Sequence, residues 1–505
     1  MKKLLKSLLF LFLNISFFSF ISSMPAGKID KVKLESVMNK YLKPVPVSPV
    51  SDETKKDETE DEQAGYSLRR SRSLDDPLWK ISSDIDPGLD KYEGSSDIES
   101  EGSSESDGDF YNLEIPRDFA TITQFDSYKE LKKNCFFKGC ERLRIIVDNI
   151  LYYATDDLIN RLVDFNLWFG ESDKIGSITP ELFNGSCGYI KKEFVSDDQN
   201  IIMIGDLHGN FKAFDAIITN LINEKILTND LVLNNQYKII VLGDFVDRGL
   251  NSLNIATVLM ILSLINQDKV VVLRGNHEDK GQFSYYGFGA ELERKLGQSF
   301  IDRFDTYFKL LPAAYFVKNS NGIFMFNHGG WQNMPENMNV FLSSDEVYLK
   351  INRLFLKRLM WNDINFDSNP SDSIEIGARG DDNLFEYPFQ VALDQMNRFG
   401  IVAKFCGHMH LVPKGAPDYL TYSSYFKDTC GFAYIGNLIN NIYVLMSGSI
   451  EVFDEQGNMK YSECINYFPS YLTLHLYTNK WIVDGCFKED DSDFKYRTVP
   501  YYNKD

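Results

Sequence analysis

Short apolar runs that each end in a burst of polar and small residues recur through the middle of the chain. Five of these runs have the length of a strand: Ile201–Ile204, Ile239–Leu242, Val270–Leu273, Ile323–Phe326 and Ile401–Phe405. Between them, the longer periodic stretches Asn210–Asn223 and Ser252–Ile265 predict helices. Strands that alternate with helices favour an α/β core whose functional residues lie at strand ends. We therefore expect the chemistry in the polar bursts.

The segments on both sides of this core have different patterns. From about Tyr128 to Phe169, apolar residues three to four positions apart predict two helices that pack on the core as an extension. After Gly436 the chain is β-rich, and Leu472 and Leu474 alternate with polar neighbours as in a half-buried strand. The expected order is a helical extension at 113–195, the main domain at 196–486 and a C-terminal tail at 487–505.

The first 112 residues predict an export signal and a disordered segment. Three lysines precede a mostly apolar run from Leu8 to Ile21, and small residues follow it. We therefore expect a signal peptide at 1–23 that directs the protein to the secretory pathway, the periplasm or an organelle lumen. An uncleaved anchor is the alternative, but the run is short for a span of about 20 residues. Residues 24–112 are rich in Ser, Asp and Glu and cannot bury enough apolar surface to fold.

Composition is that of a soluble globular protein, with 44% hydrophobic and 25% charged residues among 505. The formal net charge of −19 argues against nucleic acid as a partner, because phosphate backbones require a basic surface. Much of this charge lies in residues 51–110, with 19 Asp or Glu against seven Lys or Arg. We expect no membrane span after the signal. The seven cysteines form no CxxC pair, and free thiols compete with a Cys135–Cys140 disulfide.

Metal-ligating side chains gather in the polar bursts. The chain has six histidines, and five of them lie in these bursts, whereas His475 lies within a predicted strand and is expected to be structural. A dimetal site needs a bridging carboxylate and several neutral imidazoles around two ions about 3.5–4 Å apart. The bursts that supply this set are Gly205-Asp206-Leu207-His208-Gly209, Gly243-Asp244-Phe245-Val246-Asp247-Arg248-Gly249, Gly275-Asn276-His277-Glu278, Asn327-His328-Gly329-Gly330 and Gly407-His408-Met409-His410.

In this order the bursts resemble the signature of the calcineurin-like metallophosphoesterase superfamily: GDxH, GDxxDRG, GNHE, H and GHxH. Further segments resemble the serine/threonine phosphoprotein phosphatases within it, in a divergent or bacterial-like form: Leu273–Glu278, Tyr286-Gly287-Phe288, Leu311–Ala314, His328-Gly329-Gly330, Leu359–Asp363 and Ala378-Arg379-Gly380. The resemblance covers about residues 196–450. It implies the α/β fold of that superfamily, a four-layer β-sandwich flanked by helices (α-β-β-α), for the domain at 196–486.

The resemblance also implies a role for each site residue. Two divalent ions (Mn, Fe or Zn) would share a hydroxide that attacks phosphorus directly. One ion would be bound by Asp206, His208 and His410, and the other by Asn276, His328 and His408, with Asp244 bridging both. His277, oriented by Asp247, would protonate the leaving oxygen. Arg248 and Arg379 would hold the phosphate.

The implied activity is that of a phosphomonoesterase acting on phosphoproteins at Ser or Thr, with Tyr left open. A phosphohydrolase of small molecules or dinucleotide polyphosphates is the alternative, because the same metal core serves both. A non-catalytic binding module on the same fold would require the loss of a ligand, and every expected position is filled. The chain has GHxH where eukaryotic phosphatases have RAHQ, and it lacks a clear SAPNYC loop. Their regulatory subunits are therefore not expected partners, and the oligomeric state stays open.

Overall fold

The computed structural model describes residues 127–136, 140–168, 185, 187–335, 337–365, 373–409, 432–436, 441–447, 451–453, 459–462, 469–478, 480–488 and 493–499. The chain divides into two compact units, and the side chains discussed below belong to the unit formed by Glu53–Leu162 and Thr179–Asp505. The predicted signal peptide and acidic segment lie outside the described residues, as does His410. Among the described residues, no helix combines the length and apolar character needed to cross a membrane.

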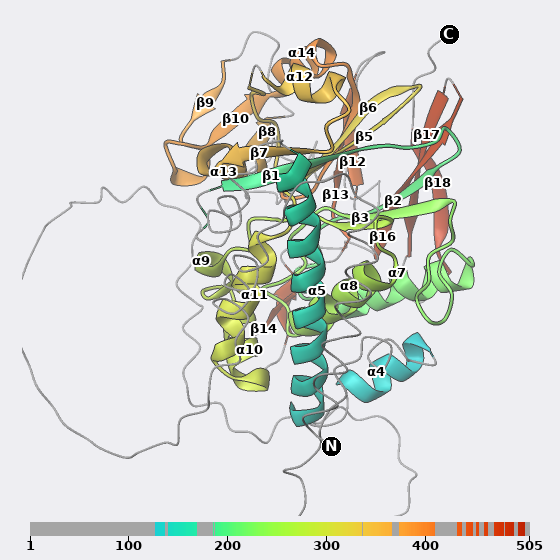
Figure 1. Cartoon of the computed structure of the whole chain (residues 1–505), viewed down its shortest axis with the longest axis vertical. Helices are drawn as coiled ribbons and strands as arrows, with labels where there is room; N and C mark the ends of the chain where they lie inside the picture. The colour runs from blue at the N-terminus through green and yellow to red at the C-terminus, as the bar shows by residue number, and fades with distance from the viewer. Residues whose placement is uncertain are drawn as a thin grey trace, which may run out of the picture. The chain divides into compact units, whose positions relative to one another are not determined.

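The helices are drawn in Figure 1 as coiled ribbons. They are α4 (Tyr128–Phe136), α5 (Cys140–Trp168), α7 (Phe211–Asn223), α8 (Ser252–Ile265), α9 (Lys280–Phe283), α10 (Phe288–Leu296), α11 (Ser299–Lys309), α12 (Asn337–Ser343), α13 (Arg353–Trp361) and α14 (Phe389–Arg398). The two helices predicted for the extension are confirmed as α4 and α5, and the two predicted for the core as α7 and α8. The Asn210 side chain caps α7 by accepting the Ala213 N–H at 3.0 Å.

The strands form two large sheets. The seven-stranded sheet has the order β12-β13-β11-β6-β5-β1-β7, and the six-stranded sheet has the order β18-β17-β16-β2-β3-β4. The strands of the first are β1 (Cys187–Phe194), β5 (Ala314–Asn319), β6 (Gly322–Asn327), β7 (Tyr348–Asn352), β11 (Ile401–Cys406), β12 (Phe432–Gly436) and β13 (Asn441–Leu445). Those of the second are β2 (Asn200–Ile204), β3 (Tyr237–Val241), β4 (Val270–Val272), β16 (Ser470–Tyr477), β17 (Lys480–Phe487) and β18 (Lys495–Val499). The smaller sheets contain β8 (Asp363–Asn365), β9 (Glu375–Ile376), β10 (Phe385–Pro388), β14 (Glu451–Phe453) and β15 (Met459–Ser462).

Alternation along the central strands sorts the core into three layers. On β2, Ile202 and Ile204 pack with α5, α7, α8, α10 and α11, while Ile201 and Met203 point into the space between the sheets. On β6, Phe324 joins that inter-sheet cluster, and Met325 packs with α12, α13 and α14. Both faces of both sheets are therefore covered, as a period of two in side-chain direction requires. The predicted α-β-β-α sandwich is confirmed.

The sheets extend beyond the predicted domain bounds of 196–486. β1 lies within the segment predicted as a helical extension, yet it pairs in parallel with β5, and β18 lies within the predicted tail, yet it pairs with β17. The sequence conceals β1 because two lysines occupy buried positions on it. Lys192 is 1% exposed, and its ammonium donates to the carbonyls of Phe341 and Ser344 at the end of α12. These acceptors stabilise a charge that would otherwise be excluded from a core.

The described cysteines Cys187, Cys406 and Cys486 are buried and form no disulfide among the described residues. The side chains of Cys135 and Cys140 lie outside the described residues, so the disulfide alternative stays a prediction.

The extension is expected to unfold together with the sandwich, because α5 shares a hydrophobic cluster with α8, α11 and the six-stranded sheet. Ile150 on α5 is 0% exposed. Ile150→Ala should lower the free energy of unfolding by about 2–5 kcal/mol, measured by chemical denaturation of the full chain. Asn160→Ala, at an exposed position on the same helix, should change it by less than about 0.5 kcal/mol. Equal effects of the two variants would show that α5 folds independently.

Candidate metal centre

The strand directions bring the five polar bursts together. β2, β3 and β4 are mutually parallel, so the residues that follow them emerge at one edge of the six-stranded sheet. β6, β11 and β13 are likewise parallel in the other sheet. An isolated bridge between Asp206 and Met446 joins the two edges. The site is thus assembled at the carboxyl ends of strands, where α/β sheets place their ligands.

The loops after these strands are backbone-strained. Nine described non-glycine residues have a positive φ, and six of them belong to the predicted site: His208, Asp244, Asp247, Arg248, Arg379 and His408. Such conformations cost of order 1–3 kcal/mol each and persist only where the surrounding structure enforces them. Two glycines permit the close approach of these loops. A Cβ atom at Gly275 would lie 2.2 Å from Asp244 Oδ1, and one at Gly407 would lie 2.0 Å from Asp206 Oδ1.

Asp244 lies at the centre of the cluster. Its Oδ2 is 3.1 Å from His328 Nε2, 3.7 Å from His208 Nε2 and 4.0 Å from His277 Nε2. Its Oδ1 accepts the backbone N–H of His277 at 2.9 Å. Burial by itself would raise the pKa of Asp244, but the imidazoles of His328 and His277 hold it well below the usual value. The carboxylate is therefore charged and faces several nitrogens at once.

Three imidazoles each use one ring nitrogen to contact a backbone carbonyl. His208 Nδ1 lies 3.2 Å from the Val246 carbonyl, His328 Nδ1 lies 3.0 Å from that of Leu242, and His408 Nε2 lies 3.2 Å from that of Trp361. In a neutral ring, a nitrogen that donates to a carbonyl leaves the other one able to accept, which is how metal-binding histidines are usually oriented. The second ring nitrogens of His328 and His408 lie 2.8 and 2.9 Å from Asn276 Oδ1.

Protonation of these histidines follows their surroundings. Burial lowers the pKa of His208 and of His408 well below the ordinary value, so both rings are neutral near pH 7. Burial by itself would also lower the pKa of His328, but Asp244 and Asp206 raise it to about 9. Burial raises the pKa of Asp206 to about 7. The carboxyl of Asp206 accepts the backbone N–H of His408 at 3.2 Å (Oδ1) and 3.0 Å (Oδ2).

These residues fit a pair of divalent cations. The donor atoms form two groups, and within each group all atoms lie within 4.8 Å of one another. One group comes from His208, Asp244 and His277, and the other from Asp244, His328 and His408. Both contain Asp244, as a bridging carboxylate requires. Buried carboxylates and inward lone pairs at such distances are costly unless a cation lies among them. Mixed oxygen and nitrogen ligands suit Mn, Fe and Zn alike. The individual ligand roles stay predictions, including that of His410.

The sequence matches known phosphoesterases over this same region. Residues 199–412 match the family model of the calcineurin-like phosphoesterases. They form a calcineurin-like metallophosphoesterase domain. The chain is 34% identical over 136 residues to serine/threonine-protein phosphatase 5 of Arabidopsis thaliana, which is 27% of this chain and 23% of that protein. It is 30% identical over 184 residues to the serine/threonine-protein phosphatase 6 catalytic subunit of Caenorhabditis elegans, which is 36% of this chain and 50% of that protein.

The chain thus spans half or less of the length of these curated relatives. Among solved structures, it is similar to a protein serine/threonine phosphatase from Saccharomyces cerevisiae with a TM-score of 0.41 and 17% identity, over 70% of this chain and 91% of that one.

His277 shares one donor group with His208 and Asp244, whereas His408 belongs to the other. The Nδ1 of His277 is 2.7 Å from Asp247 Oδ2, whose other oxygen accepts the Phe288 N–H at 3.0 Å. Its Nε2 is 3.4 Å from Arg248 Nη2. A carboxylate hydrogen-bonded to one ring nitrogen fixes the ring orientation. The phosphoesterase domain therefore presents an oriented imidazole and a guanidinium side by side.

Arg379 lies near the metal centre but already has a partner. Its Nε and Nη2 donate to the two oxygens of Asp363 at 2.8 and 2.9 Å. Asp363 Oδ1 in turn lies 3.7 Å from His408 Nε2. A bidentate pair of this kind is among the stronger hydrogen-bonded contacts in proteins. The role of Arg379 as a phosphate ligand stays a prediction, and it would require the guanidinium to share or leave Asp363.

Glu278 has a structural role in the phosphoesterase domain that the sequence analysis did not assign. Its side chain is 0% exposed and accepts four backbone N–H groups, from Gly275, Asp244, Phe245 and Val246, at 2.8–3.3 Å. It thereby fixes the loop that carries Asp244 against the loop that carries Asn276. The sequence signal for this role was that Glu278 is an acidic residue in a metal-binding burst that has no ligand role of its own.

Glu278→Gln should loosen the metal centre, because the amide NH₂ of glutamine would face N–H groups that need acceptors. Partners of ligand-bearing groups typically contribute about 10–100-fold to metal affinity, and we expect a loss in that range. Competition with a chromogenic chelator would measure it. Glu293→Gln, at an exposed position on α10, is the matched control. Unchanged affinity in Glu278→Gln would contradict the positioning role.

Proposed function

We propose that this chain is a metal-dependent phosphatase that hydrolyses phosphoproteins. The observation that carries the proposal is the convergence, around Asp244, of inward-facing imidazole nitrogens with the His277 and Arg248 pair beside them. Ligands alone would suit many metal proteins. An oriented acid and a phosphate-binding guanidinium next to those ligands favour phosphoryl transfer.

Two divalent cations at this site would supply Lewis acidity and an activated water for direct attack on phosphorus. The chain's own residues then perform the remaining work. The Arg248 guanidinium is placed to bind equatorial phosphate oxygens and offset their charge. The Nε2 side of His277 is placed to pass a proton to the departing oxygen, while Asp247 holds the ring in position through Nδ1.

A protein substrate is supported by the surface next to Arg248. Tyr286 accepts the Arg248 N–H through its carbonyl at 2.9 Å, and its ring lies 5.1 Å from that of His277. The Tyr285 ring packs against Tyr286 at 4.9 Å and is 58% exposed, and nearby in sequence Leu250 is 50% exposed. Exposed aromatic and aliphatic side chains beside a phosphate site suit contact with residues that flank a phosphorylated position. Both curated relatives above carry the name of serine/threonine-protein phosphatases.

The proposal predicts hydrolysis of phosphoserine and phosphothreonine peptides that requires metal. Turnover should disappear after chelation and return on addition of Mn²⁺. Asp244→Asn should abolish turnover and weaken the binding of both ions, because it removes the one carboxylate common to the two ligand groups. Asp230→Asn, in an exposed loop, is the control. Hydrolysis of dinucleotide polyphosphates but not of phosphopeptides would instead support the small-molecule alternative, and no turnover of either would reject the enzyme.

If His277 acts as the acid, its substitution should lower turnover without lowering metal binding. His277→Gln should lower kcat by about 10²–10⁴-fold, the usual contribution of a general acid, while metal content stays near that of the unaltered protein. Steady-state kinetics and elemental analysis would measure the two quantities, with His475→Gln as a histidine control outside the centre. Loss of metal in His277→Gln would count against the acid role and favour His277 as a ligand.

A further inference from the structure

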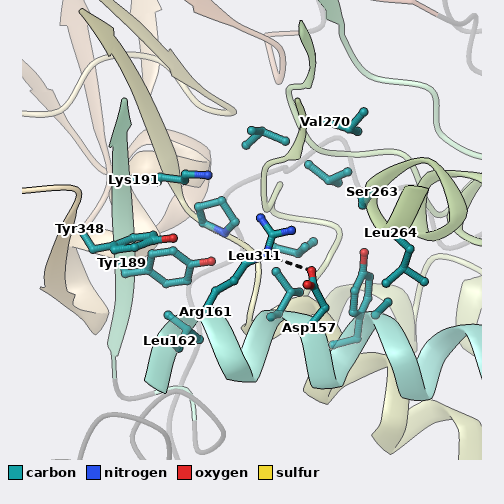
Figure 2. A pocket seen from close by; sticks show the side chains of 16 residues that line it. Asp157, Arg161, Leu162, Tyr189, Lys191, Ser263, Leu264, Val270, Leu311 and Tyr348 are labelled. Carbon is teal, nitrogen blue, oxygen red and sulfur yellow. Dashed lines mark ion pairs between the residues drawn. The ribbon is translucent and has the colours of Figure 1, made fainter. Parts of the chain in front are cut away.

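A second polar cavity lies away from the metal centre, beneath the extension helix α5. Its walls come from α5, from β1 and β7 of the seven-stranded sheet, and from β4, α8 and α11. β4 and β7 are end strands of the two sheets, so the cavity lies at the side of the sandwich. None of the predicted site residues lines it. Figure 2 shows the charged groups of Lys191 and Arg161 and the hydroxyls of Tyr189 and Tyr348 turned toward its centre.

Two buried groups in this wall lack enough hydrogen-bond partners among the described residues. Lys191 is 8% exposed, and its ammonium lies 3.5 Å from Asp268, with Glu193 as a second carboxylate that acts on its charge. Tyr307 is 2% exposed, and its hydroxyl forms no hydrogen bond to any residue the structure describes. A buried ammonium with three donors and a buried phenol rarely remain unsatisfied in a folded protein. Each is therefore expected to bind something inside the cavity.

The wall offers donors rather than acceptors. Arg161 binds Asp157 at 3.0 Å through Nε and Asp268 at 3.0 Å through Nη1. Both carboxylates are thus already in use, and Tyr189 donates its hydroxyl to the Leu310 carbonyl at 2.8 Å. The positive charges of Lys191 and Arg161 are thus paired with Asp157 in the wall and with Asp268 beside it, whereas the Lys191 ammonium and the Tyr307 hydroxyl keep donors for a ligand. Burial lowers the pKa of Lys191, although Asp268 and Glu193 act in the opposite direction.

We propose that this cavity is a binding site for a small oxyanion. The ammonium of Lys191, the hydroxyl of Tyr307 and the guanidinium of Arg161 would donate to its oxygens, as cationic and hydroxyl donors do to phosphate, sulfate or carboxylate. The cavity has a volume of about 50 Å³, and one water requires roughly 10–15 Å³. The space therefore suits a group of four or five heavy atoms. An anion bound there contacts both α5 and β1, so it links the extension to the sandwich.

The test uses the full-length protein with its metals bound, and the cavity variants below separate anion binding in the cavity from anion binding at the metal centre. Thermal unfolding is followed while phosphate, sulfate or acetate is added at constant ionic strength against chloride. We expect a saturable rise in Tm with at least one oxyanion. Lys191→Met should weaken binding by roughly ten- to a hundredfold, the loss of one hydrogen bond to a charged group. In that variant Asp268 keeps Arg161 as its partner.

Two further variants test whether the change in Tm comes from anion binding in the cavity. Tyr307→Phe removes only a hydroxyl and should also weaken the response without unfolding the chain. Lys132→Met breaks the 2.7 Å ion pair between α4 and Asp215, which lies outside the cavity wall, and should leave the response intact. Saturation by acetate alone would identify a carboxylate ligand, and saturation by phosphate or sulfate a tetrahedral one. The proposal is overturned if no oxyanion raises Tm, or if Lys191→Met and Tyr307→Phe respond like the unaltered protein.

Discussion

The main constraint on this structure is that charged and polar ligand groups must be held close together around Asp244. Two buried carboxylates and several imidazole nitrogens converge within about one coordination shell. At an effective dielectric constant of about 20, two like unit charges 4 Å apart interact by about 4 kcal/mol. The charge of His328 offsets part of this repulsion between carboxylates, and cations among the donor atoms would offset the rest. Folding of this region and metal binding are linked for that reason.

The surrounding fold supplies the rigidity that such a cluster needs. Parallel strands from two sheets deliver their carboxyl ends to the same place, and three backbone carbonyls fix the imidazole tautomers. Glu278 then joins two loops through four N–H groups. The strained φ angles of Asp244 and His408 persist because these contacts leave no relaxed alternative. The strained loops thus lower the local stability of the fold but hold the ligand side chains in place.

The sequence predicted the parts of the fold that follow from local pattern. The five central strands and the helices α5, α7 and α8 have apolar periodicities that identify them, and the ligands follow the strands directly. Lys191 and Lys192 hid β1, because a buried lysine is satisfied only by distant groups such as the carbonyls of α12. The contact of Arg379 with Asp363 and the role of Glu278 depend likewise on packing between segments, which no spacing rule reveals.

The cavity beneath α5 raises a question of energetics. A helix that covers the end strands of two sheets protects exposed strand edges, and an apolar contact would suffice for that purpose. Ion pairs buried in such a contact are often no more stabilising than hydrophobic residues of similar volume. Arg161 and Lys191 nevertheless lie there, with Lys191 nearly buried and Tyr307 unsatisfied among the described residues. Stability alone does not account for this choice of residues, whereas binding of a small anion accounts for each of them.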